Sequence, residues 1–135
     1  MNSSYPKELC IIGKVFSGKS EGKAFITFPW VRKQIIEKLG FIPYPGTLNI
    51  ELAGDDVKLK KLLVMAKPTE ISPVTGFCRG KCFKAHLMDN VKCAIIIPEI
   101  TDYPENVLEI IASVNLREKL LLKNGDTVKV KLTLQ

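Results

Sequence analysis

Most of this chain is predicted to form short β-strands that follow one another without intervening helices. The segments alternate apolar and polar residues or form short apolar runs, and turn residues bound them, which is typical of strands. The expected strands cover residues 8–16, 24–28, 47–52, 71–87 (as one or two strands), 91–97, 107–112 and 127–134. Six to eight such strands favour a closed or nearly closed β-barrel over a parallel α/β sheet, in which helices alternate with strands.

Two short helices interrupt this pattern. Pro29 opens the first, which carries apolar residues at helical spacing up to Leu39 and meets a stop signal at Gly40. The second is expected over residues 116–122, and the lysine-rich segment 55–63 is expected to form a helical turn or a surface loop. Because no linker or low-complexity tract divides the chain, we expect residues 1–135 to form one domain.

The chain is basic, with a formal charge of +6 and a pI of about 9.2. This balance is compatible with nucleic acid, a membrane surface or a phosphorylated ligand as partner. The lysines are scattered rather than clustered, which is typical of a solvated surface, and aromatic residues make up only 7%. Since no apolar run has membrane-spanning length and residues 1–6 lack an apolar signal core, we expect a cytoplasmic protein without a membrane partner.

Residues 45–52, Pro-Gly-Thr-Leu-Asn-Ile-Glu-Leu, combine a turn signal with strict alternation. Thr47 and Asn49 therefore point the same way from one strand. A hydroxyl and an amide carbonyl suit Mg²⁺, which takes few protein oxygens and fills its other positions with water and phosphates. The alternative is an ordinary barrel strand whose polar side faces solvent.

Four cysteines, Cys10, Cys78, Cys82 and Cys93, lie in a chain without a secretion signal, so reduced thiols are expected. Cys78, Cys82 and His86 superficially resemble a zinc set. Their spacing does not fit a compact zinc site, and a strand over these residues would splay the ligands, so free thiols are favoured over a metal site.

Three further segments carry candidate chemistry. Residues 17–23 form a loop with two glycines and two lysines, suited to an anion, although the upstream glycine of a Walker loop is missing and a strand is expected to follow. Residues 101–109 combine a polar loop with a strand that contains Glu109. Residues 114–119 lead into the second helix and offer Arg117 and Lys119 as cations.

Taken together, these segments resemble the archaeal CTP-dependent riboflavin kinases, over nearly the whole chain and in that family's order and spacing. The matching segments are Ser17-Gly18…Glu21-Gly22, Leu39-Gly40-Phe41-x-Pro43-Tyr44-x-Gly46-Thr47-Leu48-Asn49, Ile97-Pro98…Thr101, Glu109-Ile110-Ile111-Ala112, Leu116-Arg117-Glu118 and Leu122-Lys123-Asn124-Gly125-Asp126. The Leu39–Asn49 segment is the specific part of the match.

The resemblance implies a six-stranded cradle-loop barrel that transfers the γ-phosphoryl group of CTP to the 5′-hydroxyl of riboflavin, giving FMN and CDP. It implies Thr47 and Asn49 as Mg²⁺ ligands and Thr101 and Glu109 as flavin contacts. The implied nucleotide contacts are Gly18, Lys19, Ser20, Glu21, Gly22, Lys23, Val114, Asn115, Leu116, Arg117, Glu118 and Lys119. CTP as the donor rests on the resemblance alone. Some members carry an N-terminal winged-helix domain, for which 135 residues leave no room, so we expect no regulation through DNA.

One position departs from the family's pattern, because Ser20 stands where the loop commonly has a middle glycine. Phosphoryl transfer asks mainly for positioning and charge neutralisation, and a carboxylate near the hydroxyl could act as a general base. Glu109 is the first candidate for that role, or else a flavin contact only, and Glu21 is the second. We expect a monomer that binds riboflavin and CTP and no nucleic acid. The alternatives are a small basic barrel that binds nucleic acid and a non-catalytic flavin-binding barrel.

Overall fold

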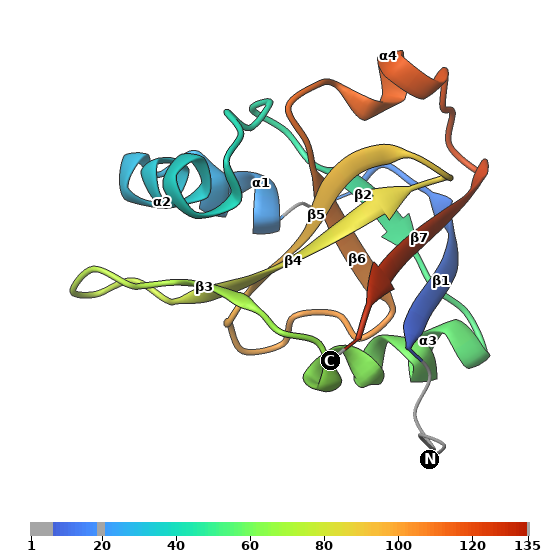
Figure 1. Ribbon diagram of the computed structural model, residues 1–135, viewed down its shortest axis with the longest axis horizontal. Coiled ribbons are helices and arrows are strands. Elements are labelled where there is room, and N and C mark those ends of the chain that lie inside the picture. The colour runs from blue at the N-terminus through green and yellow to red at the C-terminus, as the bar shows by residue number, and fades with distance from the viewer. Residues whose placement is uncertain (1–6, 19–20, 135) are drawn as a thin grey trace.

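The predicted strands close into an antiparallel barrel in the computed structural model, which describes residues 7–18 and 21–134 (Figure 1). The barrel strands are β1 (Glu8–Val15), β2 (Leu48–Glu51), β4 (Gly80–Leu87), β5 (Val91–Pro98), β6 (Val107–Ile111) and β7 (Thr127–Thr133). They are hydrogen-bonded in the order β4-β5-β6-β2-β1-β7, and pairing of β7 with β4 closes the ring. The expected six-stranded barrel is therefore confirmed.

A further strand, β3 (Thr69–Ile71), extends the sheet outside the ring. It pairs with the first part of β4, whereas β7 pairs with the last part of the same strand. The hairpin of β3 and β4 projects from the barrel beside the helices (Figure 1). Residues 71–87, expected as one or two strands, thus contain the end of β3 and all of β4.

The barrel has two apolar layers. Alternate residues such as Ile11, Ile50 and Ile110 fill its interior and are fully buried. A second cluster lies outside the barrel and includes Ala94, Ile96 and Ile111. Because β5 and β6 are covered on both faces, their sequences form apolar runs rather than clean alternation.

The helix over Pro29–Leu39, α2, forms as expected. Its Val31 and Ile35 are fully buried in the outer cluster, and the chain leaves the helix through Gly40, whose φ of 82° is a left-handed conformation that favours glycine. Two further helical segments, α3 (Asp55–Lys60) and η1 (Lys61–Met65), lie below the barrel in Figure 1. The second expected helix, α4 (Leu116–Leu120), lies above it.

The strand predicted over residues 24–28 is wrong, because the chain forms a short helix, α1 (Glu21–Ile26), at this point. Phe25 and Ile26 are adjacent in sequence and both buried in the outer cluster, whereas a strand would turn one of them away. Both edges of β1 are also taken by β2 and β7, so no barrel edge awaits another strand here. The helix begins inside the stretch 17–23 that the sequence predicts to be a loop. Of the two differences from a Walker loop, the following strand is therefore wrong, while the missing upstream glycine still holds.

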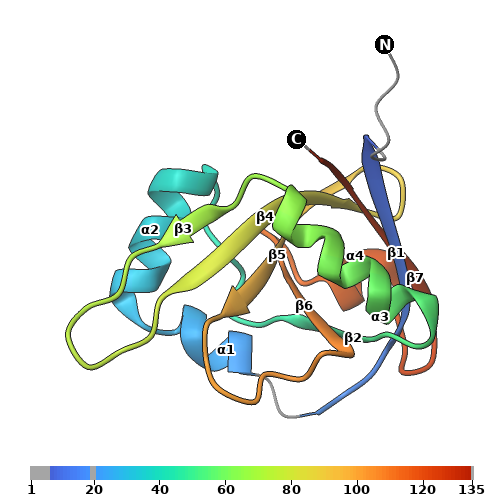
Figure 2. The ribbon, with the colours of Figure 1, turned by 90° about the horizontal axis from the view of Figure 1, so that it is seen from below.

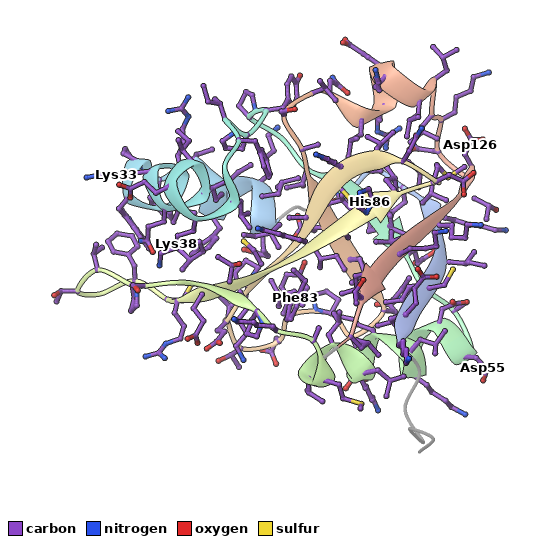
Figure 3. All side chains as sticks on the ribbon, viewed as in Figure 1. Lys33, Lys38, Asp55, Phe83, His86 and Asp126 are labelled. Atoms are coloured by element: carbon purple, nitrogen blue, oxygen red, sulfur yellow. The ribbon has the colours of Figure 1, made fainter. Side chains whose placement is uncertain are left out.

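The cysteines are free thiols, as expected. Cys82 belongs to the outer cluster and Cys93 to the barrel interior, and burial raises the pKa of each thiol to about 12. His86, on the same strand as Cys82, is exposed (Figure 3). Among the described residues, no group of three or more histidine, cysteine or acidic side chains could hold a metal ion.

The helices of the described ranges, 7–18 and 21–134, all fall short of the length and apolar character needed to cross a membrane.

Candidate functional site

Two buried polar side chains lie opposite each other on the outer face of the barrel. Asn49 on β2 and Glu109 on β6 are register partners, while their neighbours Leu48, Leu108 and Ile110 point into the interior. Asn49 is 7% exposed and Glu109 is 2% exposed, and they are the only buried polar side chains among the described residues. The alternative of a polar side that faces solvent therefore does not hold for Asn49, and a buried carboxylate requires hydrogen-bond partners.

Thr47 completes this pair from the residue before β2. Its hydroxyl group donates a hydrogen bond to Glu109 Oε1 at 3.0 Å and lies 3.3 Å from Asn49 Oδ1. Thr47 and Asn49 thus point to the same side, as the alternation of residues 45–52 predicts. Oxygen atoms of three side chains, two on strands and one just before β2, thus lie close together.

The N-terminal end of α1 supplies a further partner. The backbone N–H of Gly22 donates to Glu109 Oε2 at 2.7 Å, and so one of the donors that a helix leaves unpaired in its first turn is satisfied. A Cβ atom on Gly22 would lie 2.9 Å from the carboxylate carbon and from both of its oxygens. Glycine is therefore needed for this close approach.

The loop between β5 and β6 adds the third donor to the carboxylate. The Tyr103 hydroxyl group donates to Glu109 Oε2 at 2.6 Å. Burial, the hydrogen bond to Glu109 and the charges of Glu109 and Glu21 raise the pKa of Tyr103 above its ordinary value, so the hydroxyl group keeps its proton. Figure 2 shows this loop passing beside α1, which explains how both segments reach the same carboxylate.

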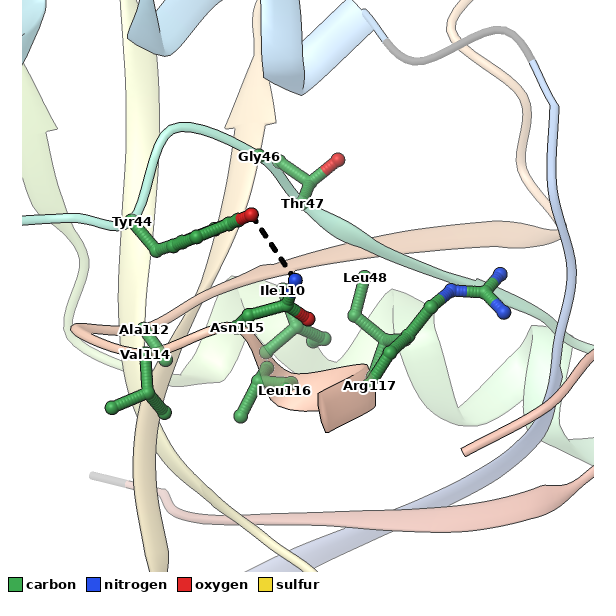
Figure 4. A pocket seen from close by; sticks show the side chains of 10 residues that line it. All are labelled: Tyr44, Gly46, Thr47, Leu48, Ile110, Ala112, Val114, Asn115, Leu116 and Arg117. Atoms are coloured by element: carbon green, nitrogen blue, oxygen red, sulfur yellow. Dashed lines mark hydrogen bonds between the residues drawn. The ribbon is translucent and has the colours of Figure 1, made fainter. Parts of the chain in front are cut away.

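A pocket adjoins the carboxylate cluster between the start of β2 and the segment that enters α4 (Figure 4). Thr47 belongs to both, and the pocket also includes Tyr44, Asn115 and Arg117. Asn115 is fixed by two bonds: its Oδ1 accepts from the Glu118 N–H at 3.2 Å, which caps α4, and its amide donates to the Tyr44 hydroxyl at 3.1 Å. The cap explains why a helix begins at Leu116.

Arg117 ties the pocket to the end of β1. One guanidinium nitrogen, Nη2, donates to Asn124 Oδ1 at 2.8 Å and to the Phe16 carbonyl and the Ser17 hydroxyl at 3.2 Å each. Ser17 also donates to Asn124 at 3.1 Å. The arginine thus holds the segment that leads into the glycine-bearing loop against the turn before β7.

The structure brings part of the predicted site together and leaves part of it apart. Gly22, Thr47, Asn49 and Glu109 meet in one cluster, and the Val114–Lys119 segment borders the adjoining pocket. Leu116 itself is buried in the barrel core, while Glu118 and Lys119 are exposed.

Thr101 is exposed in the loop that carries Tyr103. Gly18 is exposed before α1, whereas Glu21 and Lys23 lie within α1. The predicted residues Lys19 and Ser20 lie outside the described residues.

Sequence reasoning missed two residues of this cluster and its surroundings. In the sequence, Tyr103 lies in a polar, proline-containing loop, and Lys60 lies among several lysines in the segment 55–63. The signal that could have found Tyr103 is an aromatic residue in an otherwise polar loop six positions before a buried acid. Lys60 gives no comparable local signal, since its partners are 44 and 47 residues away.

The chain matches one family model and is similar to several proteins of known name. A family model named CTP-dep_RFKase, described as a domain of unknown function (DUF120), matches residues 15–132. Riboflavin kinase of Methanosarcina barkeri is 39% identical over 127 residues, which are 91% of this chain and 56% of that protein. Riboflavin kinase of Archaeoglobus fulgidus is 40% identical over 92% of this chain and 54% of its own length. For riboflavin kinase of Pyrobaculum aerophilum the identity is 42%, over 92% of this chain and 60% of that protein. The chain thus spans a little over half the length of these relatives.

Proposed function

The chain belongs to the family of CTP-dependent riboflavin kinases, and on this basis we propose that it transfers the γ-phosphoryl group of CTP to the 5′-hydroxyl of riboflavin, yielding FMN and CDP. The observation that carries the proposal is the cluster of the buried Asn49 and Glu109 with the half-buried Thr47 at the start of α1, beside a pocket that reaches Arg117. Phosphoryl transfer needs two substrates held side by side with their charge neutralised, and this arrangement offers adjoining sites for both.

The nucleotide is assigned to the side of the cluster formed by residues 18–23 and 114–119. In support, Arg117, a residue of the second stretch, donates hydrogen bonds to Phe16 and Ser17, which directly precede the first stretch. Lys23 on α1 and Lys119 on α4 would add positive charge for a bound nucleotide. Cytosine as the base follows from the family alone.

Mg²⁺ fits the donor set that Thr47 and Asn49 provide. Their side-chain oxygens lie 3.3 Å apart, and Glu109 Oε1 lies 3.0 Å from the threonine hydroxyl, so three hard oxygen atoms lie close together here. Mg²⁺ usually binds through few protein oxygens together with water and phosphates, and needs no cage of three acidic or histidine ligands. Bound there, the ion would neutralise charge on the transferred phosphoryl group.

Glu109 is proposed to hold riboflavin rather than to take the proton of its hydroxyl group. Gly22, Thr47 and Tyr103 each donate a hydrogen bond to the carboxylate, so its oxygens are already oriented by three segments of the chain. An acceptor fixed in this way is suited to recognising a donor on the flavin or the ribityl chain. Thr101, in the same loop as Tyr103, is proposed as a second flavin contact.

We further propose that the barrel works as a monomer without nucleic acid. Single-stranded nucleic acid needs exposed aromatic side chains among basic residues. Three of the aromatic residues instead pack together in and against the outer core: Phe28 stacks on Trp30, and Phe25 meets the Trp30 ring edge to face. Light scattering would measure the oligomeric state, and retention of single-stranded RNA on a filter at physiological salt would contradict the second statement.

The experiment that tests the function is a phosphorylation assay with purified protein, riboflavin, Mg²⁺ and each of CTP, ATP, GTP and UTP, with FMN measured by chromatography. We expect FMN with CTP at a rate well above that with ATP. Equal turnover with ATP would reject the donor but keep the kinase, whereas no FMN with any nucleotide would reject the proposed activity.

A further inference from the structure

Within residues 101–106, Tyr103 is the one residue that is not exposed. Its neighbours Asp102, Pro104 and Glu105 are exposed, whereas Tyr103 is half-buried and its hydroxyl group lies 2.6 Å from Glu109 Oε2. A bond between a loop and a buried carboxylate restricts both groups. The inward position of Tyr103 therefore bears on the geometry of the candidate site as well as on the loop.

Lys60 also holds this loop. Its ammonium nitrogen donates to the carbonyl oxygens of Val107 at 2.8 Å and Pro104 at 3.1 Å, and lies 5.2 Å from the centre of the Tyr103 ring. Burial lowers the pKa of Lys60, an effect that the charges of Glu105 and Glu109 oppose. A lysine withdrawn from water needs such partners, and here they come from the β5–β6 loop and from β6.

The carboxylate of a glutamate has no strongly preferred orientation of its own. Rotation of a carboxylate about its last bond has only broad preferences, so the plane of the group is set by bonds to its two oxygens. In this site Thr47 bonds to Oε1, while Gly22 and Tyr103 bond to Oε2. Tyr103 is the only one of these three that comes from the loop, and its hydroxyl group makes the shortest of the three bonds.

We propose that Tyr103 is a positioning residue that fixes the carboxylate of Glu109 for riboflavin, and that Lys60 in turn fixes Tyr103. This inference rests on the proposed function, because it takes Glu109 as the group that holds the flavin substrate. It assigns a role to a tyrosine and to a lysine from α3, a helix that carries none of the predicted site residues.

Tyr103→Phe tests the first half of the proposal, because it keeps the ring beside Lys60 and removes only the hydroxyl group. We expect the dissociation constant and the KM for riboflavin to rise about 10-fold, the scale of one hydrogen bond to a charged group. The KM for CTP and kcat should stay within about twofold, since the nucleotide side is untouched. In a Glu109→Gln background the same substitution should add little, because the tyrosine acts through that carboxylate.

Lys60 is tested by two substitutions and a matched control. Lys60→Met removes the charge and should reproduce the riboflavin defect of Tyr103→Phe, whereas Lys60→Arg should restore much of the affinity. Lys58→Met changes an exposed lysine two residues away on the same helix, with 81% of its side chain exposed, and should leave riboflavin binding unchanged. Equal defects in Lys58→Met and Lys60→Met would overturn the role of Lys60.

Two readouts separate this inference from the proposed function. If the wild-type protein makes FMN but Tyr103→Phe leaves riboflavin affinity unchanged, or weakens CTP and riboflavin equally, the positioning role is rejected and the kinase stands. If the wild-type protein neither binds nor phosphorylates riboflavin, the proposed function is rejected. In that case a double-mutant cycle of Tyr103→Phe and Glu109→Gln, measured by thermal unfolding, still tests whether the two side chains are coupled. Additive changes in the free energy of unfolding would reject that coupling.

Discussion

Replacing Gly22 with alanine is a sensitive test of the cluster around Glu109. The new methyl carbon would lie 2.9 Å from the carboxylate carbon and both oxygens of Glu109, a distance at which something must shift. The carboxylate cannot retreat freely, because Thr47 and Tyr103 bond to it from β2 and the β5–β6 loop. We therefore expect α1 to move away and the bond from the Gly22 N–H to Glu109 to break.

Two opposing contributions set the change in the free energy of unfolding of Gly22→Ala. Exchanging glycine for alanine within a helix gains at most about 1 kcal/mol of stability. Losing the 2.7 Å hydrogen bond to a buried carboxylate costs about 1.5–3 kcal/mol. The net expectation is a loss of about 1–2 kcal/mol, which for a chain of 135 residues lowers the melting temperature by about 3–7 °C.

Calorimetry or thermal circular dichroism measures this change, with riboflavin affinity measured on the same samples. Ala24→Gly is the matched control, because Ala24 is an exposed residue of the same helix and reports helix propensity alone. The control should lose about 0.5–1 kcal/mol of stability and keep its riboflavin affinity. If Gly22→Ala instead raises the melting temperature and keeps affinity, the close approach of α1 to Glu109 is not a constraint and the reasoning fails.

The remaining predictions concern the oxygen ligands and the carboxylate. Asn49→Leu nearly conserves volume and Thr47→Val conserves shape. We expect both to remove most activity and to lower the affinity for Mg²⁺ measured by titration, while circular dichroism shows a folded barrel. Asn90→Leu, the same exchange in the exposed β4–β5 turn, is the control. Near-normal activity in both site variants would mean that the metal binds elsewhere. Glu109→Gln should weaken riboflavin binding with kcat nearly intact, whereas a fall in kcat of about 10²–10⁴-fold with unchanged affinity would make Glu109 the general base instead.

The sequence predicts much of the barrel because strand alternation is a local property. Each strand of the ring needs one face for the interior, so the period-two pattern around Ile11, Ile50 and Val130 can be detected without knowing the partners. The helix α2 is equally local, because Pro29 and Gly40 mark its ends chemically. Thr47 and Asn49 could be assigned to one side for the same reason, since alternation fixes their common direction.

Only the tertiary structure decides how that side becomes a site. Gly22 and Glu109 are 87 residues apart, and their contact depends on α1 lying against β5, next to Glu109 of β6, rather than joining the sheet as a strand. A short run such as Ala24-Phe25-Ile26 fits helix and strand alike, and the surface it packs against makes the choice. Tyr103 and Lys60 enter for the same reason, because a loop reaches the buried carboxylate of Glu109 and a distant helix holds that loop. The pattern of the chain therefore determines which residues can face the site, and closure of the barrel determines which of them touch.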